Sequence, residues 1–96
     1  MIVEFLSCAE QEFAEAVAWY NEQNPGLGFD FAAEIKRAIS RVEQHPEAWT
    51  LLSPRTRRIR VSRFPYSLVY QVRGECLLIV AVMHMNRHPQ IWEERI

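Results

Sequence analysis

The sequence has 96 residues, of which 49% are hydrophobic and 24% are charged, and its formal net charge is −1. This length suits a single small domain covering residues 1–96, and the composition excludes a disordered, collagen-like or disulfide-rich chain. No stretch approaches the roughly 20 apolar residues of a membrane span, and the N-terminus lacks the features of a signal peptide. We therefore expect a cytoplasmic protein without a membrane partner.

The charges are unevenly distributed along the chain. Residues 1–50 carry three basic and nine acidic side chains, a net charge of −6, whereas residues 51–96 carry eight arginines and three acids, a net charge of +5. Five of these arginines fall between residues 55 and 63. Because the planar guanidinium group suits phosphates and carboxylates, we expect the second half to bind an anionic partner.

The first residues predict a strand followed by a helix. Residues 2–5 have the pattern of a short strand, and Ser7 with Glu10 fits a capping box that starts a helix. Apolar residues then recur at helical spacing, namely Ala9, Phe13, Ala16, Val17 and Tyr20. The sequence Asn-Pro-Gly-Leu-Gly at residues 24–28 ends this helix after about Gln23, because proline cannot continue the hydrogen-bond ladder.

A second helix is predicted directly after this break. Its apolar stripe runs from Phe31 to Val42, and Pro46 ends it near His45. The two helices therefore form a hairpin. The two cysteines, Cys8 and Cys76, are interpreted as small buried hydrophobic residues, because they are too few for a disulfide scaffold and lack metal-type spacing.

The second half of the chain changes to the period of two that is typical of strands. After a loop at residues 46–54, the run from Arg58 to Ser62 alternates polar and apolar residues, and residues 67–73 form the next predicted strand. Gly74 and Glu75 fit a tight turn before residues 76–84. That last segment is apolar on both faces, which indicates a central strand, although a buried helix segment has the same pattern.

Together these elements predict an α+β fold in the order β-α-α-β-β-β. The helical hairpin is expected to pack on one face of a small antiparallel sheet, and residues 89–95 are expected to form a short C-terminal helix or turn. On the middle strand, Ile59 and Val61 should point toward the helices, which places Arg58 and Arg60 on the open face. These arginines either bind an anionic partner or serve as solvated edge charges.

Three segments resemble the RelE/ParE superfamily of toxins from bacterial type II toxin-antitoxin, or plasmid stabilisation, modules. They are AVAWYNEQNPGLGFDF at residues 16–31, RFPYSLVY at residues 63–70 and AVMHMNRHPQIW at residues 81–92. The resemblance implies a cognate antitoxin that wraps and silences the toxin, in a homodimer or a toxin-antitoxin hetero-oligomer. It also implies one of two activities: RelE-like members cut mRNA inside the ribosome, whereas ParE-like members inhibit DNA gyrase.

The positions that resemble the nuclease pattern are only partly kept. Arg58, Arg60 and Arg87 match it, but Ser67 stands where those nucleases have an arginine, and Trp92 with Glu93 stands where they have a tyrosine. Metal-free RNA cleavage needs cations, a base and an acid, so the losses favour the ParE-like activity and the arrest of growth through gyrase. The ribosome and mRNA are the less favoured partners.

Two alternatives stay open. One is a metal-independent endoribonuclease that uses Arg58, Arg60, Arg87 and His84, and the other is a non-toxic relative that keeps only antitoxin binding. For partner binding the sequence predicts Arg58, Arg60, Arg63, Tyr66, Arg87 and Trp92. Packing also explains Tyr66, and Arg63 could instead pair with an acid of the helical hairpin.

No cofactor or metal is expected. The chain has no glycine-rich phosphate-binding motif. His84 and His88 are four residues apart, but they straddle the predicted end of a strand, where that spacing does not suit a metal. His84 either closes the strand end with a hydrogen bond or serves as an acid or base.

Overall fold

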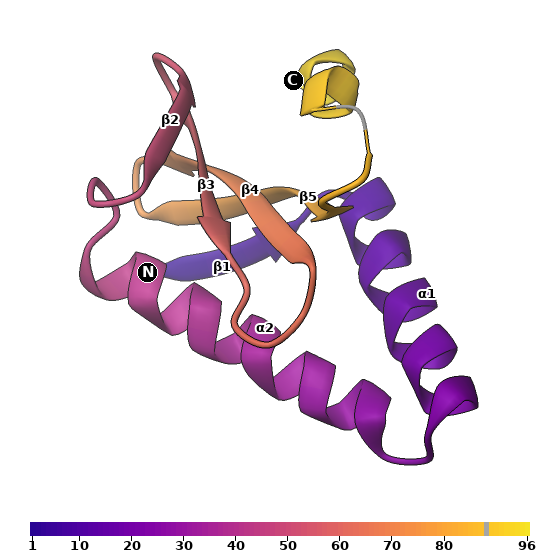
Figure 1. The fold of residues 1–96 in the computed structure, drawn as a ribbon. Helices are drawn as coiled ribbons and strands as arrows, with labels where there is room; N and C mark the ends of the chain where they lie inside the picture. The colour runs from indigo at the N-terminus through magenta and orange to yellow at the C-terminus, as the bar shows by residue number, and fades with distance from the viewer. Residues whose placement is uncertain (88) are drawn as a thin grey trace.

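The computed structural model describes residues 1–87 and 89–96, apart from the side chains of residues 89–91. Its elements are β1 (Ile2–Phe5), α1 (Ser7–Gln23), α2 (Leu27–Gln44), β2 (Thr50–Ser53), β3 (Thr56–Arg60), β4 (Tyr66–Arg73), β5 (Cys76–His84) and the 3-10 helix η1 (Pro89–Arg95). Figure 1 shows both long helices on one side of the sheet, whereas η1 lies on the other side. The predicted α+β architecture, with a helical hairpin on one face and a short C-terminal helix, is confirmed.

The five strands form one sheet in the order β1-β5-β4-β3-β2. Neighbouring strands from β2 to β5 are antiparallel, but β1 pairs with β5 in parallel. The sheet is therefore mixed rather than purely antiparallel, because the chain leaves β1 through both helices and returns four strands later alongside it. β5 is an interior strand between β1 and β4, in agreement with its apolar sequence, and its residues from Leu77 to Met83 are all buried.

The sheet contains one strand that the sequence did not predict. β2 lies in the expected loop and pairs with β3 so that Thr50 is opposite Arg58, with an irregularity between Leu51 and Ser53. It is an edge strand, and Leu51 is exposed. Two exposed residues are followed by two half-buried ones, so the strand has no alternation of polar and apolar residues by which it could be recognised.

The helices have the predicted extents, but α1 starts differently. Its N-cap is Leu6 rather than Ser7, and no side chain caps the first turn. The reason is the neighbouring strand: the Leu6 amide donates to the Ile79 carbonyl at 3.0 Å, so the pairing of β1 with β5 continues until the residue before the helix. Ser7 is thereby already helical, and the predicted capping box is wrong.

The turn between the helices depends on two glycines. Gly26 has a left-handed backbone with φ 92°, which glycine adopts without steric cost. Gly28 lies so close to α1 that a Cβ atom there would approach the Val17 carbonyl oxygen to 2.1 Å. The Gly28 amide also donates to Asn21 Oδ1 at 2.8 Å, which fixes the second helix against the first.

The main core lies between the helices and the sheet. Aromatic rings from both layers meet there: Phe31 of α2 lies 5.3 Å from Tyr20 of α1, 5.2 Å from Phe64 and 4.9 Å from Tyr66 between ring centroids. Ile59 and Leu77 from the strands complete this cluster.

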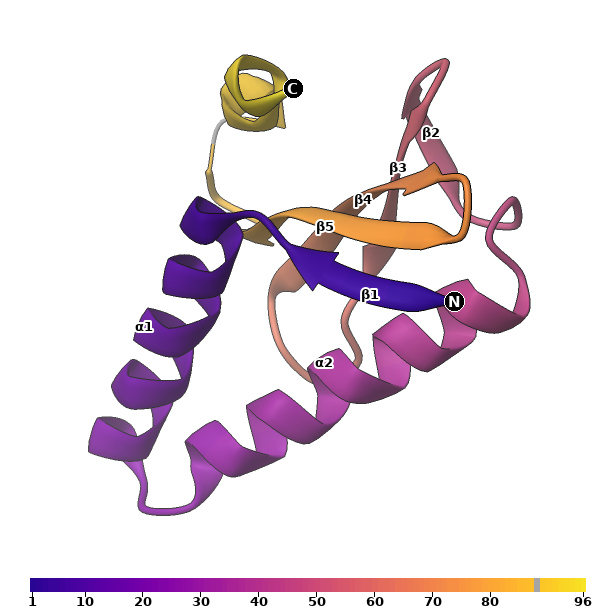
Figure 2. The ribbon, with the colours of Figure 1, turned by 180° about the vertical axis from the view of Figure 1, so that it is seen from behind.

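A smaller cluster lies on the opposite face of the sheet. Trp92 of η1 is buried there against Val69, Val80 and Met83. The open face is therefore partly covered by the protein's own C-terminal segment, and Trp92, predicted to bind a partner, packs inside the protein. Figure 2 shows η1 and the β2–β3 hairpin standing apart on this face.

The two cysteines are less buried than the sequence predicted. Cys8 and Cys76 are free thiols of intermediate exposure rather than buried residues, since they lie at the starts of α1 and β5.

No helix in the described part of the chain is both long and apolar enough to cross a membrane.

Candidate functional site

β3 places two predicted arginines on the open face. Ile59 and Val61 are 2% and 1% exposed and belong to the main core, whereas Arg58 and Arg60 are exposed. Neither arginine is seen in an ion pair or side-chain hydrogen bond with another described residue. The alternation along the strand predicted this position on the open face, and partner binding by these arginines stays a prediction.

The C-terminal segment and the β2–β3 hairpin enclose a groove on this face, which we call the open-face groove. It has a volume of about 200 Å³ and is lined by Leu52, Arg58, Ser67, Val69, Met83, His84, Met85, Arg87 and Trp92. Guanidinium groups from β3 and from the segment after β5 border an otherwise apolar and neutral surface. The groove thus combines two cations, one imidazole and one hydroxyl group.

The predicted site residues do not all belong to this groove. Arg60 and Arg63 line a separate hollow of about 640 Å³ at the turn between β3 and β4. Tyr66 lines a third hollow beside α1, of about 280 Å³, together with His84 and Arg87. The structure therefore brings Arg58, His84 and Arg87 together and leaves Arg60 and Arg63 at a neighbouring position.

Arg87 shares a carboxylate with Arg95. Glu12 of α1 receives two hydrogen bonds from Arg95, at 2.7 and 2.9 Å, and its Oε2 atom lies 3.5 Å from Arg87 Nη1. The Val82 amide donates to Glu12 at 3.1 Å. The hydrogen bonds from Arg95 to Glu12 raise the pKa of the Arg95 guanidinium, against the opposing effect of burial.

This network reduces the charge that Arg87 offers to a partner. The sequence had not singled out Glu12, because it falls outside the apolar stripe of its helix and lies 75 residues from Arg87. No local pattern could signal such a pair.

Tyr66 and His84 lie against each other at the end of the sheet. Their rings are 5.1 Å apart in an edge-to-face arrangement. His84 Nδ1 accepts a hydrogen bond from the Asn86 amide at 3.1 Å, which is the strand-closing role that the sequence offered as one alternative. Burial raises the pKa of Tyr66, with smaller contributions from neighbouring Tyr20 and Glu12 and an opposing one from Arg87. Tyr66 also contacts Phe31 of the core, so packing accounts for much of its surface.

Arg63 and Trp92 have structural contacts as well. Arg63 lies in the bend after β3 with a left-handed φ of 73°, and its guanidinium is 3.9 Å from Asp30 of α2, with both side chains largely exposed. This is the pairing with an acid of the hairpin that the sequence left open. Trp92 is only 6% exposed, so little of its ring remains for a partner.

No three side chains of the types His, Cys, Asp and Glu within residues 1–87 and 89–96 are grouped so that they could hold a metal ion. His88 lies outside the described residues, so the pair with His84 is not described.

The family comparison agrees with this fold. The model of the ParE toxin of the type II toxin-antitoxin system parDE matches residues 3–89. The chain belongs to this ParE toxin family. The match contains both helices, all five strands and most of the open-face groove. No curated protein matches the sequence.

Two solved structures resemble this ParE family member in fold. One is from the chromosomal ParDE toxin-antitoxin system of P. aeruginosa, with a TM-score of 0.74 and 16% identity, covering 88% of this chain and 95% of the other. The second is a mutant of the E. coli toxin RelE in the free state, with a TM-score of 0.67 and 22% identity, covering 98% of this chain and 92% of the other. At these identities the likeness shows the fold alone.

The ParE family member departs from the nuclease resemblance inside the groove itself. Ser67, where the resemblance expects an arginine, is 8% exposed and lies opposite Met83 on the neighbouring strand. A neutral hydroxyl therefore occupies the groove at a position where the nuclease pattern has a cation.

Proposed function

We propose that this chain is a ParE-type toxin that arrests bacterial growth by binding DNA gyrase and is neutralised by a cognate antitoxin. The observation that carries the proposal is the family match over residues 3–89. The fold shared with the ParDE toxin-antitoxin system of P. aeruginosa supports the toxin-antitoxin part of this proposal.

The chemistry of the open-face groove favours protein binding over RNA cleavage. Metal-free cleavage of RNA requires cations that stabilise the growing negative charge on the phosphate, beside a base and an acid. Ser67 provides no charge, Trp92 is buried, and Arg87 shares the carboxylate of Glu12 with Arg95. Arg58 is the groove's one cation without an ion pair among the described side chains, and this is a weak basis for such chemistry.

A supercoiling assay tests the gyrase proposal. Purified chain should inhibit supercoiling of relaxed plasmid by DNA gyrase, and its expression should arrest growth and induce DNA damage signalling. An assay with the chain and its antitoxin mixed beforehand is the control, and supercoiling should then be restored. If supercoiling continues at concentrations that stop growth, the gyrase proposal is wrong.

For the antitoxin we propose that Arg58 and Arg60 contact acidic side chains, with Arg63, Tyr66 and Arg87 at the margin of the contact. Arginine forks bind carboxylates with two parallel hydrogen bonds, and rim charges make association sensitive to salt. The antitoxin encoded beside the toxin gene is the partner for this test.

Arg58→Glu combined with Arg60→Glu should weaken antitoxin binding and leave the remaining binding less sensitive to salt. Lys36→Glu combined with Arg41→Glu makes the same change of charge on α2, where neither side chain has an ion pair among the described residues, and is the matched control. Dissociation constants at low and physiological salt measure both effects. An unchanged constant in the Arg58 and Arg60 variant would contradict their role.

One observation favours a second candidate function, ribosome-dependent mRNA cleavage. Arg58, His84 and Arg87 line the same groove, so two guanidiniums and an imidazole face one small volume. Primer extension on translated mRNA tests this candidate. Cuts at the ribosomal A site that vanish in His84→Ala would support it, and the absence of any cut would exclude it.

A further inference from the structure

A second cluster of arginines lies outside the open-face groove. A hollow of about 610 Å³ opens at the far end of the sheet, where the β2–β3 turn, the end of β4 and the loop after α2 meet. Arg55, Arg57 and Arg73 line it, and Glu47 is the one acid among its lining residues. We call it the hairpin hollow.

The side chains around the hairpin hollow are held in position. Arg73 Nε donates to Gln71 Oε1 at 2.9 Å, and Gln71 Nε2 donates to Thr56 Oγ1 at 2.9 Å. Gln71 and Thr56 are both buried, so this chain of hydrogen bonds is anchored inside the sheet. Among the described residues Arg73 bonds only through Nε, so its two terminal nitrogens can form the fork that binds oxyanions.

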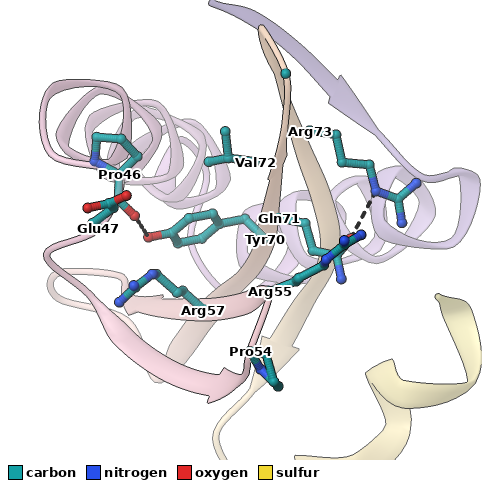
Figure 3. A pocket seen from close by; sticks show the side chains of 10 residues that line it. Pro46, Glu47, Pro54, Arg55, Arg57, Tyr70, Gln71, Val72 and Arg73 are labelled. Carbon is teal, nitrogen blue, oxygen red and sulfur yellow. Dashed lines mark hydrogen bonds between the residues drawn. The ribbon is translucent and has the colours of Figure 1, made fainter.

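Arg57 is held in a similar way. Its Nη1 donates to the Trp49 carbonyl at 2.7 Å, which fixes the guanidinium, and no other described residue accepts a hydrogen bond from it. Figure 3 shows Arg55 and Arg73 extending to the side of Gln71, whereas Arg57 and Tyr70 extend to the opposite side. The hollow therefore presents cations in two groups rather than at one point.

These three cations are not neutralised by the described part of the chain. The ion pairs found there involve Arg37, Arg63, Arg87 and Arg95, and none involves Arg55, Arg57 or Arg73. Arg55 and Arg73 extend to the same side, where like charges repel each other and a bound anion relieves the repulsion. Nor does Tyr70 supply an anion, because burial raises its pKa to about 12 and its hydroxyl donates to the Pro46 carbonyl.

We propose that the hairpin hollow binds a ligand with two or more adjacent phosphate groups. The fork of Arg73 together with Arg55 would hold one phosphate, and Arg57, which extends to the opposite side, would contact a second phosphate further along the ligand. The hollow is far larger than one phosphate ion, and its two groups of cations suit an extended oligophosphate. A nucleic-acid backbone and a free polyphosphate share this chemistry, and the experiment below distinguishes them.

Isothermal titration of the full chain with inorganic tripolyphosphate tests the proposal. Arg55→Gln combined with Arg73→Gln should weaken binding by about tenfold or more. Arg58→Gln combined with Arg60→Gln removes the same charge from the open face and should change binding by less than about threefold. Equal losses in the two variants would show diffuse attraction to the basic half, and no binding to the unmodified chain would also overturn the proposal.

The conservative variant Arg73→Lys distinguishes the effect of the forked guanidinium geometry from the effect of the positive charge. Lysine keeps the positive charge but cannot form the two parallel bonds of a guanidinium, so binding should fall to an intermediate value. Binding equal to that of the unmodified chain would contradict the assigned geometry. Circular dichroism verifies that the variants fold, as expected because Arg55 and Arg73 are exposed.

The source of the phosphates follows from two further titrations. A short DNA duplex that binds more tightly than tripolyphosphate, and that loses affinity in the Arg55 and Arg73 variant, identifies a nucleic-acid backbone. Binding of tripolyphosphate without binding of DNA identifies a free polyphosphate. Tighter binding of a glutamate-rich peptide than of either phosphate ligand would show that the hollow selects carboxylates, and this would overturn the proposal.

Discussion

The two faces of the sheet are stabilised in different ways. On the helix-facing side of the sheet, aromatic and aliphatic side chains from both helices and from the strands form one continuous core. On the other face, a smaller cluster under Trp92 and the contact between Glu12 and Arg95 hold the C-terminal segment. Beside it lie Arg58 and Arg60, which form no ion pair with a described residue. Most of the stabilising contacts therefore lie on the helix-facing side of the sheet, whereas the arginines expected to bind a partner lie on the other side. Substitutions on the helix-facing side should mainly lower stability, and substitutions of these arginines should mainly weaken binding.

The largest loss of stability is expected on the helix-facing side. Phe31→Ala removes a fully buried ring that contacts Tyr20, Phe64 and Tyr66, and it should cost about 4 kcal/mol in the free energy of unfolding. Phe29→Ala on the same helix is the matched control, because that ring is exposed. Urea unfolding measures both, and similar losses would contradict the placement of the core.

A smaller but clear loss is expected where the open face is joined to α1. Glu12→Gln removes the charge that holds Arg95, a partly buried guanidinium, and should cost about 3 kcal/mol. Glu15→Gln, which affects an exposed hydrogen bond to Gln11, is the control and should change stability little. If both variants unfold at the same urea concentration, the contact does not hold the C-terminal segment.

The buried phenol of Tyr70 gives a pH dependence on the helix-facing side. Tyr70→Phe removes the hydrogen bond to the Pro46 carbonyl and should cost about 1 kcal/mol at neutral pH. Burial raises the pKa of Tyr70 from 10.0 to about 12, so the unfolded chain loses this proton first and stability falls as the pH rises through this range. The phenylalanine variant should lose stability less steeply there. Unfolding curves below and above pH 10.0 measure the two slopes.

The smallest effect on stability is expected from the arginines of β3. Arg58 and Arg60 face Val69 and Ser67 on β4, which carry no charge. Arg58→Glu combined with Arg60→Glu should therefore change the free energy of unfolding by less than about 0.5 kcal/mol, although antitoxin binding weakens. A large loss of stability would mean that these side chains have internal partners after all.

Most of the elements could be predicted from the sequence because each has a local signal. The helices α1 and α2 have apolar stripes, and β5 is apolar on both faces. β2 escaped prediction because this edge strand has two exposed residues followed by two half-buried ones, without alternation. The capping box at Ser7 was predicted wrongly because a strand pairing that extends to Leu6, not a side-chain cap, sets the start of α1.

The candidate site was only partly predictable. The position of Arg58 and Arg60 on the open face follows from alternation along one strand. The pairing of Arg87 and Arg95 with Glu12, and the anchoring of Arg73 through Gln71 and Thr56, join segments far apart in the chain. Such contacts depend on the sheet order, which no single segment encodes.

The sequence by itself determined the α+β composition, the resemblance to the toxin superfamily and an arginine-rich second half, because periodicity and charge are local properties. Only the tertiary structure decided which arginines are neutralised. Charges pair according to their distance in space. Packing the helices and η1 against the sheet brought carboxylates to some guanidiniums, whereas the arginines of β3 and of the hairpin hollow form no ion pair with any described residue.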